Sequence, residues 1–313
     1  MHRAPILGYG TEFLEKSADI LMAIFHHKDR PLHYLERGRG TPLLLIHGLG
    51  SSGADWALQV RAFEGGYRVI VPDLPGCGHS SALRDGCSIA DFAALLWALL
   101  DRLNIARPNI VGYSLGGAVA LEMALQRPEA VPHLGLINSL TSYRLDTLSK
   151  WLEARITVVL VRLIGMKLLG RLYAARMFPQ PWQRALRKRA AEVVGAAQPA
   201  SYISIVTALI RWSAAGRLGP LRSRVLIVVA EHDLMPLAQQ LASASDLGAA
   251  IAVVQGSRHG TPFDAVEATN ACIIALLADQ PPPSVDRLKC DEPRPAYPLE
   301  FAGSLAEQHA LGP

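Results

Sequence analysis

The sequence predicts an α/β fold in which a mostly parallel central sheet carries helices on both faces and receives an inserted helical cap. Two observations predict it. Apolar runs of strand length alternate with helix-like segments, which is the pattern of parallel strands joined by helices. Between residues 140 and 217 the alternation stops, and 13 Lys/Arg residues stand against 3 Asp/Glu residues in an apolar, helix-like segment. We therefore expect 27–139 and 218–279 to form the core and 140–217 the cap.

The two ends of the chain differ from this core. Apolar residues in 12–26 lie near helical spacing, so 1–26 is predicted to be an N-terminal helical extension. After Asp279 the composition changes to prolines among charges, beginning with Pro281, Pro282 and Pro283. Such a composition cannot bury much apolar surface, so 280–313 is predicted to be a loosely ordered tail.

The predicted core elements follow from short apolar runs between turn residues and from one capping signal. Ser88 precedes a helical pattern with Asp91 three residues later, which is typical of a helix N-terminus. The predicted strands are 42–46, 67–71, 109–113, 134–138, 225–230 and 251–254. The predicted helices are 89–103, 115–126, 236–245 and 262–277.

Bulk composition narrows the class of protein. Of 313 residues, 50% are hydrophobic and 19% charged, which indicates a globular chain rather than a disordered one. The N-terminal residues lack a secretory pattern, so the cytoplasm is the expected location. The cysteines show no C-x-x-C spacing, and none sits beside histidines in a metal-like cluster, which favours a reducing compartment and no metal site. These cysteines are Cys77, Cys87, Cys272 and Cys290.

The pentapeptide Gly112-Tyr113-Ser114-Leu115-Gly116 is the strongest chemical signal. It lies between a predicted strand and a predicted helix, where a sharp turn needs glycines and exposes the serine hydroxyl. The N-terminal amides of the following helix favour any negative charge that develops there. Ser114 is therefore a candidate nucleophile.

A serine hydroxyl needs a base and an orienting acid, and two strand ends supply them. Asp233 follows the strand 225–230, and His259 follows the strand 251–254. Glu231 and His232 are alternatives for the acid and the base, but Glu231 lies nearer the strand and His232 adjoins the proposed acid. The chain order Ser114, Asp233, His259 favours these three as the catalytic residues.

A glycine-rich loop, His47-Gly48-Leu49-Gly50, follows the strand 42–46 and can present backbone amides. We expect the N–H groups of Leu49 and Leu115 to form an oxyanion hole. His47 is interpreted as structural, holding the loop by a hydrogen bond.

These motifs resemble the α/β-hydrolase superfamily, in the branch whose members carry a helical cap. The resemblance covers roughly 27–278 and rests on the 47–50 loop, the Ser114 pentapeptide with Gly117, Asp233, His259 and the segment 73–80. That last segment matches the family's D-x-x-G-x-G-x-S turn, which is structural in the family, so Cys77 within it is interpreted as a packing residue. The chain departs from the family at Ala230, where a glycine is frequent early in the acid turn.

The resemblance implies a serine hydrolase without metal or organic cofactor. Ser114 argues against the branches of the family that have an aspartate at the position of this nucleophile. The favoured function is hydrolysis of carboxylic esters with apolar acyl groups, in the manner of an esterase or lipase. The alternatives are a carbon–carbon bond or lactone hydrolase of aromatic degradation, and a cofactor-free haloperoxidase or perhydrolase-like enzyme. A binding or signalling protein on the same scaffold is a further alternative, against which the intact triad counts.

The cap is expected to decide the substrate. Residues 156–172 are strongly apolar and interrupted by Arg and Lys, and a basic cluster follows at 184–189. The simplest interpretation is an amphipathic helix whose long cations extend to water. The alternatives are peripheral contact with a membrane or lipid surface, and recognition of a substrate carboxylate. No nucleic-acid-binding motif is present, so nucleic acid is not an expected partner.

Overall fold

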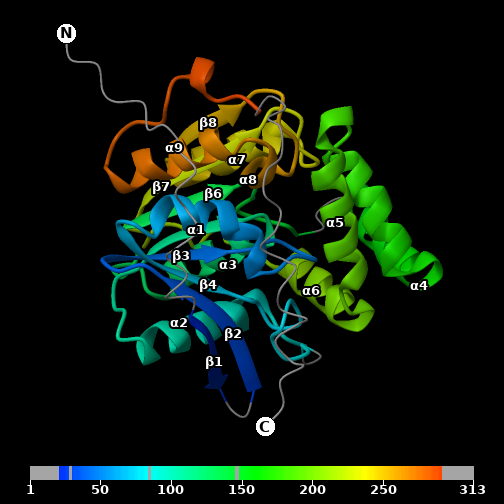
Figure 1. Cartoon of the computed structure of the whole chain (residues 1–313), viewed down its shortest axis with the longest axis horizontal. Coiled ribbons are helices and arrows are strands. Elements are labelled where there is room, and N and C mark those ends of the chain that lie inside the picture. The colour runs from blue at the N-terminus through cyan, green and yellow to red at the C-terminus, as the bar shows by residue number, and fades with distance from the viewer. Residues whose placement is uncertain (1–20, 28–29, 84–85, 145–147, 291–313) are drawn as a thin grey trace, which may run out of the picture.

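The computed structural model describes residues 21–27, 30–83, 86–144 and 148–290. Within them one eight-stranded sheet has the order β1-β2-β4-β3-β5-β6-β7-β8 (Figure 1). The strands β3 to β8 run parallel, whereas β1 pairs with β2, and β2 with β4, in antiparallel fashion. The strands are β1 (Leu21–His27), β2 (Arg30–Arg37), β3 (Thr41–Ile46), β4 (Tyr67–Pro72), β5 (Asn109–Tyr113), β6 (His133–Ile137), β7 (Arg224–Ala230) and β8 (Ala250–Val254). The predicted fold class is confirmed.

Helices cover both faces of this sheet because successive strand residues point to opposite sides. Leu44 and Ile46 of β3 pack with α2 and α3, whereas Leu43 and Leu45 pack with α1 and α9. The core helices are α1 (Ala57–Phe63), α2 (Ile89–Arg102), α3 (Leu115–Gln126), α7 (Leu237–Leu247), α8 (Thr261–Asp264) and α9 (Val266–Leu277), and η1 (Gly53–Trp56) precedes α1. Both faces of the central strands β3, β5, β6 and β7 are thus largely buried, which explains why the sequence shows continuous apolar runs there.

The predicted bounds of β5 and α3 are confirmed at both ends. The start of α2 also agrees, and its cap is reciprocal. Ser88 Oγ accepts the amide of Asp91, and the Asp91 carboxylate accepts the amide of Ser88.

The prediction of a helix over 12–26 is wrong for its last residues, because Leu21–His27 forms β1 in a hairpin with β2. Alternate residues Ala23 and Phe25 pack on the core while Met22 and Ile24 face solvent. The apolar spacing was compatible with both periods, and pairing with β2 selects the strand. Residues 12–20 of that prediction lie outside the described residues.

The predicted loosely ordered tail is wrong over 285–290. The short helix η3 (Val285–Arg287) leads to Leu288, which is buried in the core. The amide of Gln255 donates to the Leu288 carbonyl at 2.8 Å, and the Cys290 amide donates to the Gln255 carbonyl at 2.8 Å. One buried leucine and a continuation of β8 therefore fix this segment in spite of its composition; residues 291–313 lie outside the described part.

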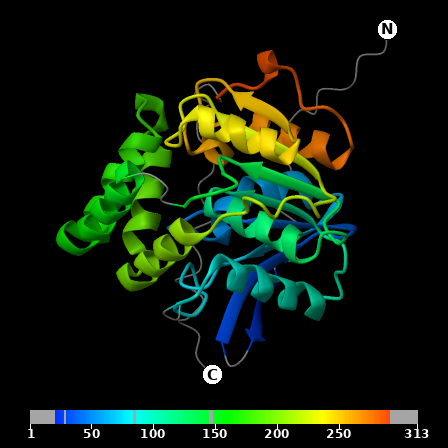
Figure 2. The ribbon, with the colours of Figure 1, turned by 180° about the vertical axis from the view of Figure 1, so that it is seen from behind.

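A helical insertion lies between β6 and β7, in the segment predicted as the cap. It consists of α4 (Leu148–Met177), η2 (Pro181–Gln183), α5 (Arg184–Ala196) and α6 (Pro199–Arg211). In Figures 1 and 2 α4 is the outermost element on this side of the molecule, and α5 lies between it and the sheet. The insertion has a small core of its own, formed by Val161, Met166, Val194, Tyr202 and Val206.

Gly165 interrupts α4, since its φ of 70° and ψ of 167° are not helical. Among the described residues no single helix is long and apolar enough to cross a bilayer. The pair Pro181–Ala196 and Pro199–Arg211 meets the length and composition criteria together, but it is bent by 97°.

The C-terminal end of the insertion is tied to the core by Glu122 of α3. Its carboxylate accepts hydrogen bonds from Trp212 Nε1 at 2.7 Å and from Arg217 Nη2 at 2.7 Å. Burial opposes ionisation of Glu122, but the hydrogen bonds from Arg217 and Trp212 outweigh it, so the pKa of this carboxyl is lowered.

We predict that Glu122→Ala lowers the free energy of unfolding by about 2 kcal/mol, because it leaves the buried Trp212 N–H without its acceptor. Urea unfolding monitored by circular dichroism measures this. The matched control is Glu129→Ala, whose side chain is 85% exposed and 3.8 Å from Arg222. It should cost no more than about 0.5 kcal/mol. Equal losses in the two variants would contradict the role given to Glu122.

Candidate active site

Ser114 occupies a strained turn between β5 and α3. Its φ of 53° and ψ of −116° lie in a region that L residues rarely adopt. A Cβ on Gly112 would collide with the Gly116 carbonyl, and one on Gly116 would collide with the Ile46 carbonyl of β3. Only glycine permits this close approach of helix to sheet, and the turn projects Ser114 from the carboxyl edge of the sheet.

The structure brings Ser114, His259 and Asp233 into one hydrogen-bonded chain. His259 Nε2 lies 3.0 Å from Ser114 Oγ, and His259 Nδ1 lies 2.7 Å from Asp233 Oδ1. The side chains of His259 and Asp233 are 6% and 1% exposed. Because the Asp233 carboxylate is withdrawn from water, its field acts strongly on the imidazole and holds Nδ1 as the donor.

The alternative acid and base lie elsewhere. Glu231 accepts the Gly256 amide at 2.8 Å and is exposed, and His232 faces Glu231 at 3.7 Å on the surface. Asp264 ends α8 and accepts the Ser257 hydroxyl at 2.7 Å. Neither Glu231 nor His232 has a hydrogen bond to Ser114 or His259 among those of the described residues.

Two loops bring backbone amides to the same edge of the sheet. Leu49 belongs to the loop after β3 and lines a pocket together with Ser114, and Leu115 is the first residue of α3. In the described part of the chain neither amide donates to a protein acceptor. Both are available to a bound oxygen atom, as a helix N-terminus and a glycine-rich loop allow.

His47 holds the first of these loops through both ring nitrogens. Its Nδ1 donates to the Gly48 carbonyl at 2.8 Å, and its Nε2 accepts the Leu74 amide at 2.9 Å. This assignment requires the neutral ring, and complete burial lowers the pKa of His47 accordingly.

Asp73 organises the turn after β4. One carboxylate oxygen accepts the Gly53 amide at 2.7 Å, and the other accepts the His79 amide at 2.8 Å. Cys77 in this turn is buried against the core, and burial raises the pKa of its thiol to about 12. These contacts indicate a structural role for the segment 73–80.

Asn138, directly after β6, was not predicted. Its Nδ2 donates to the His259 carbonyl at 2.8 Å and to Thr261 Oγ1 at 2.7 Å, while its Oδ1 accepts the Ala230 amide at 2.9 Å. One amide side chain thus joins the strand end that precedes Asp233 to the loop that carries His259. A polar residue at a predicted strand end was the signal that could have identified it.

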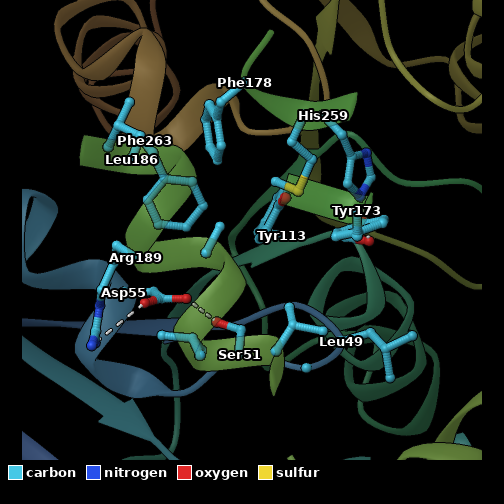
Figure 3. Close-up of a pocket in the computed structure, with 16 residues that line it drawn as sticks. Leu49, Ser51, Asp55, Tyr113, Tyr173, Phe178, Leu186, Arg189, His259 and Phe263 are labelled. Atoms are coloured by element: carbon cyan, nitrogen blue, oxygen red, sulfur yellow. Dashed lines mark hydrogen bonds and ion pairs between the residues drawn. The ribbon is translucent and has the colours of Figure 1, made fainter. Parts of the chain in front are cut away.

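A pocket with a cavity volume of about 60 Å³ lies over Ser114, between the sheet edge and the insertion (Figure 3). Its walls are almost entirely apolar and aromatic. They include Leu49, Tyr113, Tyr173, Met177, Phe178, Leu186, Val193, Val194 and Phe263. Tyr113 and Tyr173 flank the imidazole, with ring centroids 5.4 Å and 6.4 Å from that of His259.

One polar corner interrupts this lining, on the far side of the pocket from His259 (Figure 3). Asp55 of η1 accepts the hydroxyl of Ser51, and its other oxygen lies 4.0 Å from Arg189 Nη2 of α5. Burial raises the pKa of Asp55, and the hydrogen bond from Ser51 and the charge of Arg189 oppose that shift. The sequence could not reveal this pair, because its members are 134 positions apart and meet only through the packing of α5 on the core.

Among the described residues, no group of three or more His, Cys, Asp and Glu side chains is arranged to hold a metal ion. The arrangement supports attack by the serine hydroxyl on a carbonyl, with proton transfer to His259.

Comparisons with known proteins bear on the family and the fold. The sequence profile described as alpha/beta hydrolase fold matches residues 41–163. A protein of Variovorax paradoxus named "Putative carbamate hydrolase RutD" is 32% identical over 214 residues, which are 66% of this chain and 79% of that protein.

A hydrolase of Acinetobacter baylyi, named for (E)-2-((N-methylformamido)methylene)succinate, is 34% identical over 110 residues, or 35% of this chain. The matched part of the chain spans 42% of the length of that hydrolase, and 35% and 30% of the length of two other curated relatives. The crystal structure of the enol-lactonase from Burkholderia xenovorans LB400 superposes with a TM-score of 0.74 at 22% identity, covering 82% of this chain and all of that one.

We predict that acid destabilises the protein partly through His47. Because its folded pKa is lowered, the stabilisation is complete above the ordinary value of 6.5 and is lost as the pH falls toward the folded pKa. The slope is at most about 1.4 kcal/mol per pH unit for one such group. Urea unfolding measured from roughly pH 7.5 to pH 5 covers the histidine titration. Over this range the free energy of unfolding should fall less steeply for His47→Gln than for wild type. The exposed His26→Gln serves as control, and a variant profile parallel to wild type would refute the assignment.

Proposed function

The chain belongs to the α/β-hydrolase family, and on that premise we propose that it is a serine hydrolase that cleaves carboxylic esters with apolar acyl groups. The observation that carries this proposal is the chain of hydrogen bonds from Asp233 through His259 to Ser114, at 2.7 Å and 3.0 Å. Both distances are within the range that proton transfer requires.

The proposed reaction has two halves. Ser114 Oγ attacks the ester carbonyl while His259 Nε2 takes the hydroxyl proton, and Asp233 stabilises the resulting imidazolium. The amides of Leu49 and Leu115 receive the oxyanion of the tetrahedral intermediate. His259 then returns the proton to the departing alcohol, which leaves an acyl group on Ser114. Water, deprotonated by His259, attacks this acyl group and releases the acid.

The proposed substrate class follows from the pocket. Its aliphatic and aromatic walls suit an apolar acyl chain, and the insertion helices α4 and α5 supply many of them, as a cap over the nucleophile would. Arg189 reaches the pocket, but Asp55 offsets its charge. A neutral ester therefore fits better than a substrate with a carboxylate at its far end.

A second candidate is hydrolysis of a lactone or a carbon–carbon bond by the same three residues. The names of similar proteins, an enol-lactonase and a hydrolase of a succinate derivative, favour it, as does the presence of Arg189 in the pocket wall. The haloperoxidase or perhydrolase-like alternative uses the same triad and is favoured by a structure described as a bromoperoxidase from Bacillus anthracis, of TM-score 0.74 and 21% identity.

A fluorophosphonate probe tests the nucleophile. We predict covalent labelling of wild type and none of Ser114→Ala, with hydrolysis of p-nitrophenyl butyrate reduced about 10³-fold or more in the variant. Ser52→Ala is the matched control, since this serine lies in the neighbouring loop without a side-chain cap bond and outside the pocket. Unlabelled wild type, or equal labelling of Ser114→Ala, would contradict the role given to Ser114.

Asp55→Asn tests the substrate class. Removing this carboxylate frees Arg189, so kcat/KM for the p-nitrophenyl monoester of a dicarboxylic acid should rise about tenfold relative to p-nitrophenyl butyrate. Adding Arg189→Gln should abolish the gain. An unchanged ratio in both variants would show that the corner does not contact the acyl chain, and a wild type that already prefers the acidic ester would favour the second candidate.

A further inference from the structure

The outer side of the insertion exposes an unusual number of large apolar side chains. Twelve such side chains are exposed among the described residues, and six of them belong to α4 and η2. Their exposed fractions run from 44% to 77%, with Leu163 the highest. The six are Ile156, Val159, Leu163, Leu168, Leu172 and Trp182.

Helical spacing groups five of these residues along the two halves of α4. Ile156, Val159 and Leu163 are three and four positions apart and share one side of the first half of α4. Leu168 and Leu172, four positions apart, share one side of the second half beyond Gly165. The buried Val161 and Met166 point instead into the small core of the insertion. We call the six exposed side chains the apolar outer surface.

A strongly basic groove adjoins this surface, between α4 and α5. Five of the nine residues that line it are cations, and one is acidic. Toward acidic side chains of the described residues, these cations make one ion pair, between Lys188 and Glu192 at 3.9 Å, and both partners are largely exposed. The lining residues are Lys167, Arg171, Arg184, Arg187, Lys188, Ala191, Glu192, Gly195 and Ala196.

We propose that the apolar outer surface and the basic groove dock this protein on an anionic lipid bilayer. Apolar side chains enter the boundary between headgroups and acyl chains, and Lys and Arg side chains beside them meet the lipid phosphates. Charge complementarity selects this occupant. A symmetric contact with a second copy would bring two identical basic grooves together, and a nucleic acid would leave the exposed leucines in water.

The placement of α5 relates this surface to the pocket. Leu186, Ala190 and Val193 of α5 face the pocket over Ser114, whereas Arg187 and Ala191 face the basic groove on the other side of the same helix. The bilayer would therefore lie against the helix that forms a wall of the pocket. The docking itself does not depend on the proposed hydrolase function, because binding is measured without turnover.

Sedimentation of the full chain with lipid vesicles tests the proposal. We expect binding to vesicles of phosphatidylcholine mixed with phosphatidylglycerol, weak binding to phosphatidylcholine alone, and loss of binding as salt increases. Two triple variants divide the surface into its parts. The apolar variant is Leu163→Ser/Leu168→Ser/Leu172→Ser, and the charge variant is Lys167→Gln/Arg171→Gln/Arg184→Gln.

Each charge contributes about a fivefold factor near an anionic surface, so the charge variant should partition about a hundredfold less. The apolar variant should bind about tenfold less, or weaker still, to both vesicle types. Control variants carry two comparable substitutions each on the core, at exposed residues away from the insertion, and should bind as wild type. They are Leu241→Ser/Ile274→Ser and Arg102→Gln/Arg107→Gln.

Circular dichroism and urea unfolding show whether each variant retains its fold, as exposed substitutions should. Wild type that stays in the supernatant with anionic vesicles would overturn the proposal, as would triple variants that bind like their controls. Light scattering supplies one more outcome. A dimer that the apolar variant abolishes, without vesicle binding by wild type, would assign the surface to a second copy and refute the bilayer.

Discussion

The contact between the first turn of α3 and the ends of β3 and β5 is the constraint on which the site depends. The helix backbone approaches the sheet so closely that Gly112 and Gly116 leave no space for a Cβ, and Ser114 between them adopts a positive φ. Such a conformation costs free energy, which the surrounding buried core must supply. As a result, the backbone geometry of the turn holds the Ser114 hydroxyl at the edge of the sheet.

The remaining groups of the site reach the same edge because parallel strands end there together. Asp233 follows β7 and His259 follows β8. The side chain of Asn138, after β6, connects the two strand ends by hydrogen bonds. The hydrogen bonds of Asn138 link three consecutive strand ends, so the position of the imidazole depends on a residue outside the triad. A catalytic role for the triad remains our proposal, whereas its geometry is a property of the fold.

The sequence was sufficient for those features that depend on local pattern. The strand–helix alternation predicted the fold class, and the glycine pentapeptide predicted β5 and α3 to the residue. Strand ends located Ser114, Asp233 and His259. The sequence was insufficient where tertiary contacts decide. Apolar spacing in 21–26 fits two periods until β2 is present, Leu288 is buried in a segment whose composition indicates disorder, and Asp55 meets Arg189 only across the insertion.

The hydrogen bonds at the base of the insertion have a consequence for how such a protein can change over time. Ser142 and Ser213 form an antiparallel bridge, and the Tyr143 amide donates to the Trp212 carbonyl at 3.1 Å. The chain therefore leaves the core and returns to it at adjacent points, already paired. Whatever lies between these points can lengthen, shorten or be exchanged at little cost in loop-closure entropy. The scaffold that holds the nucleophile is in this way separable from the helices that surround its substrate, and the two can diverge at different rates.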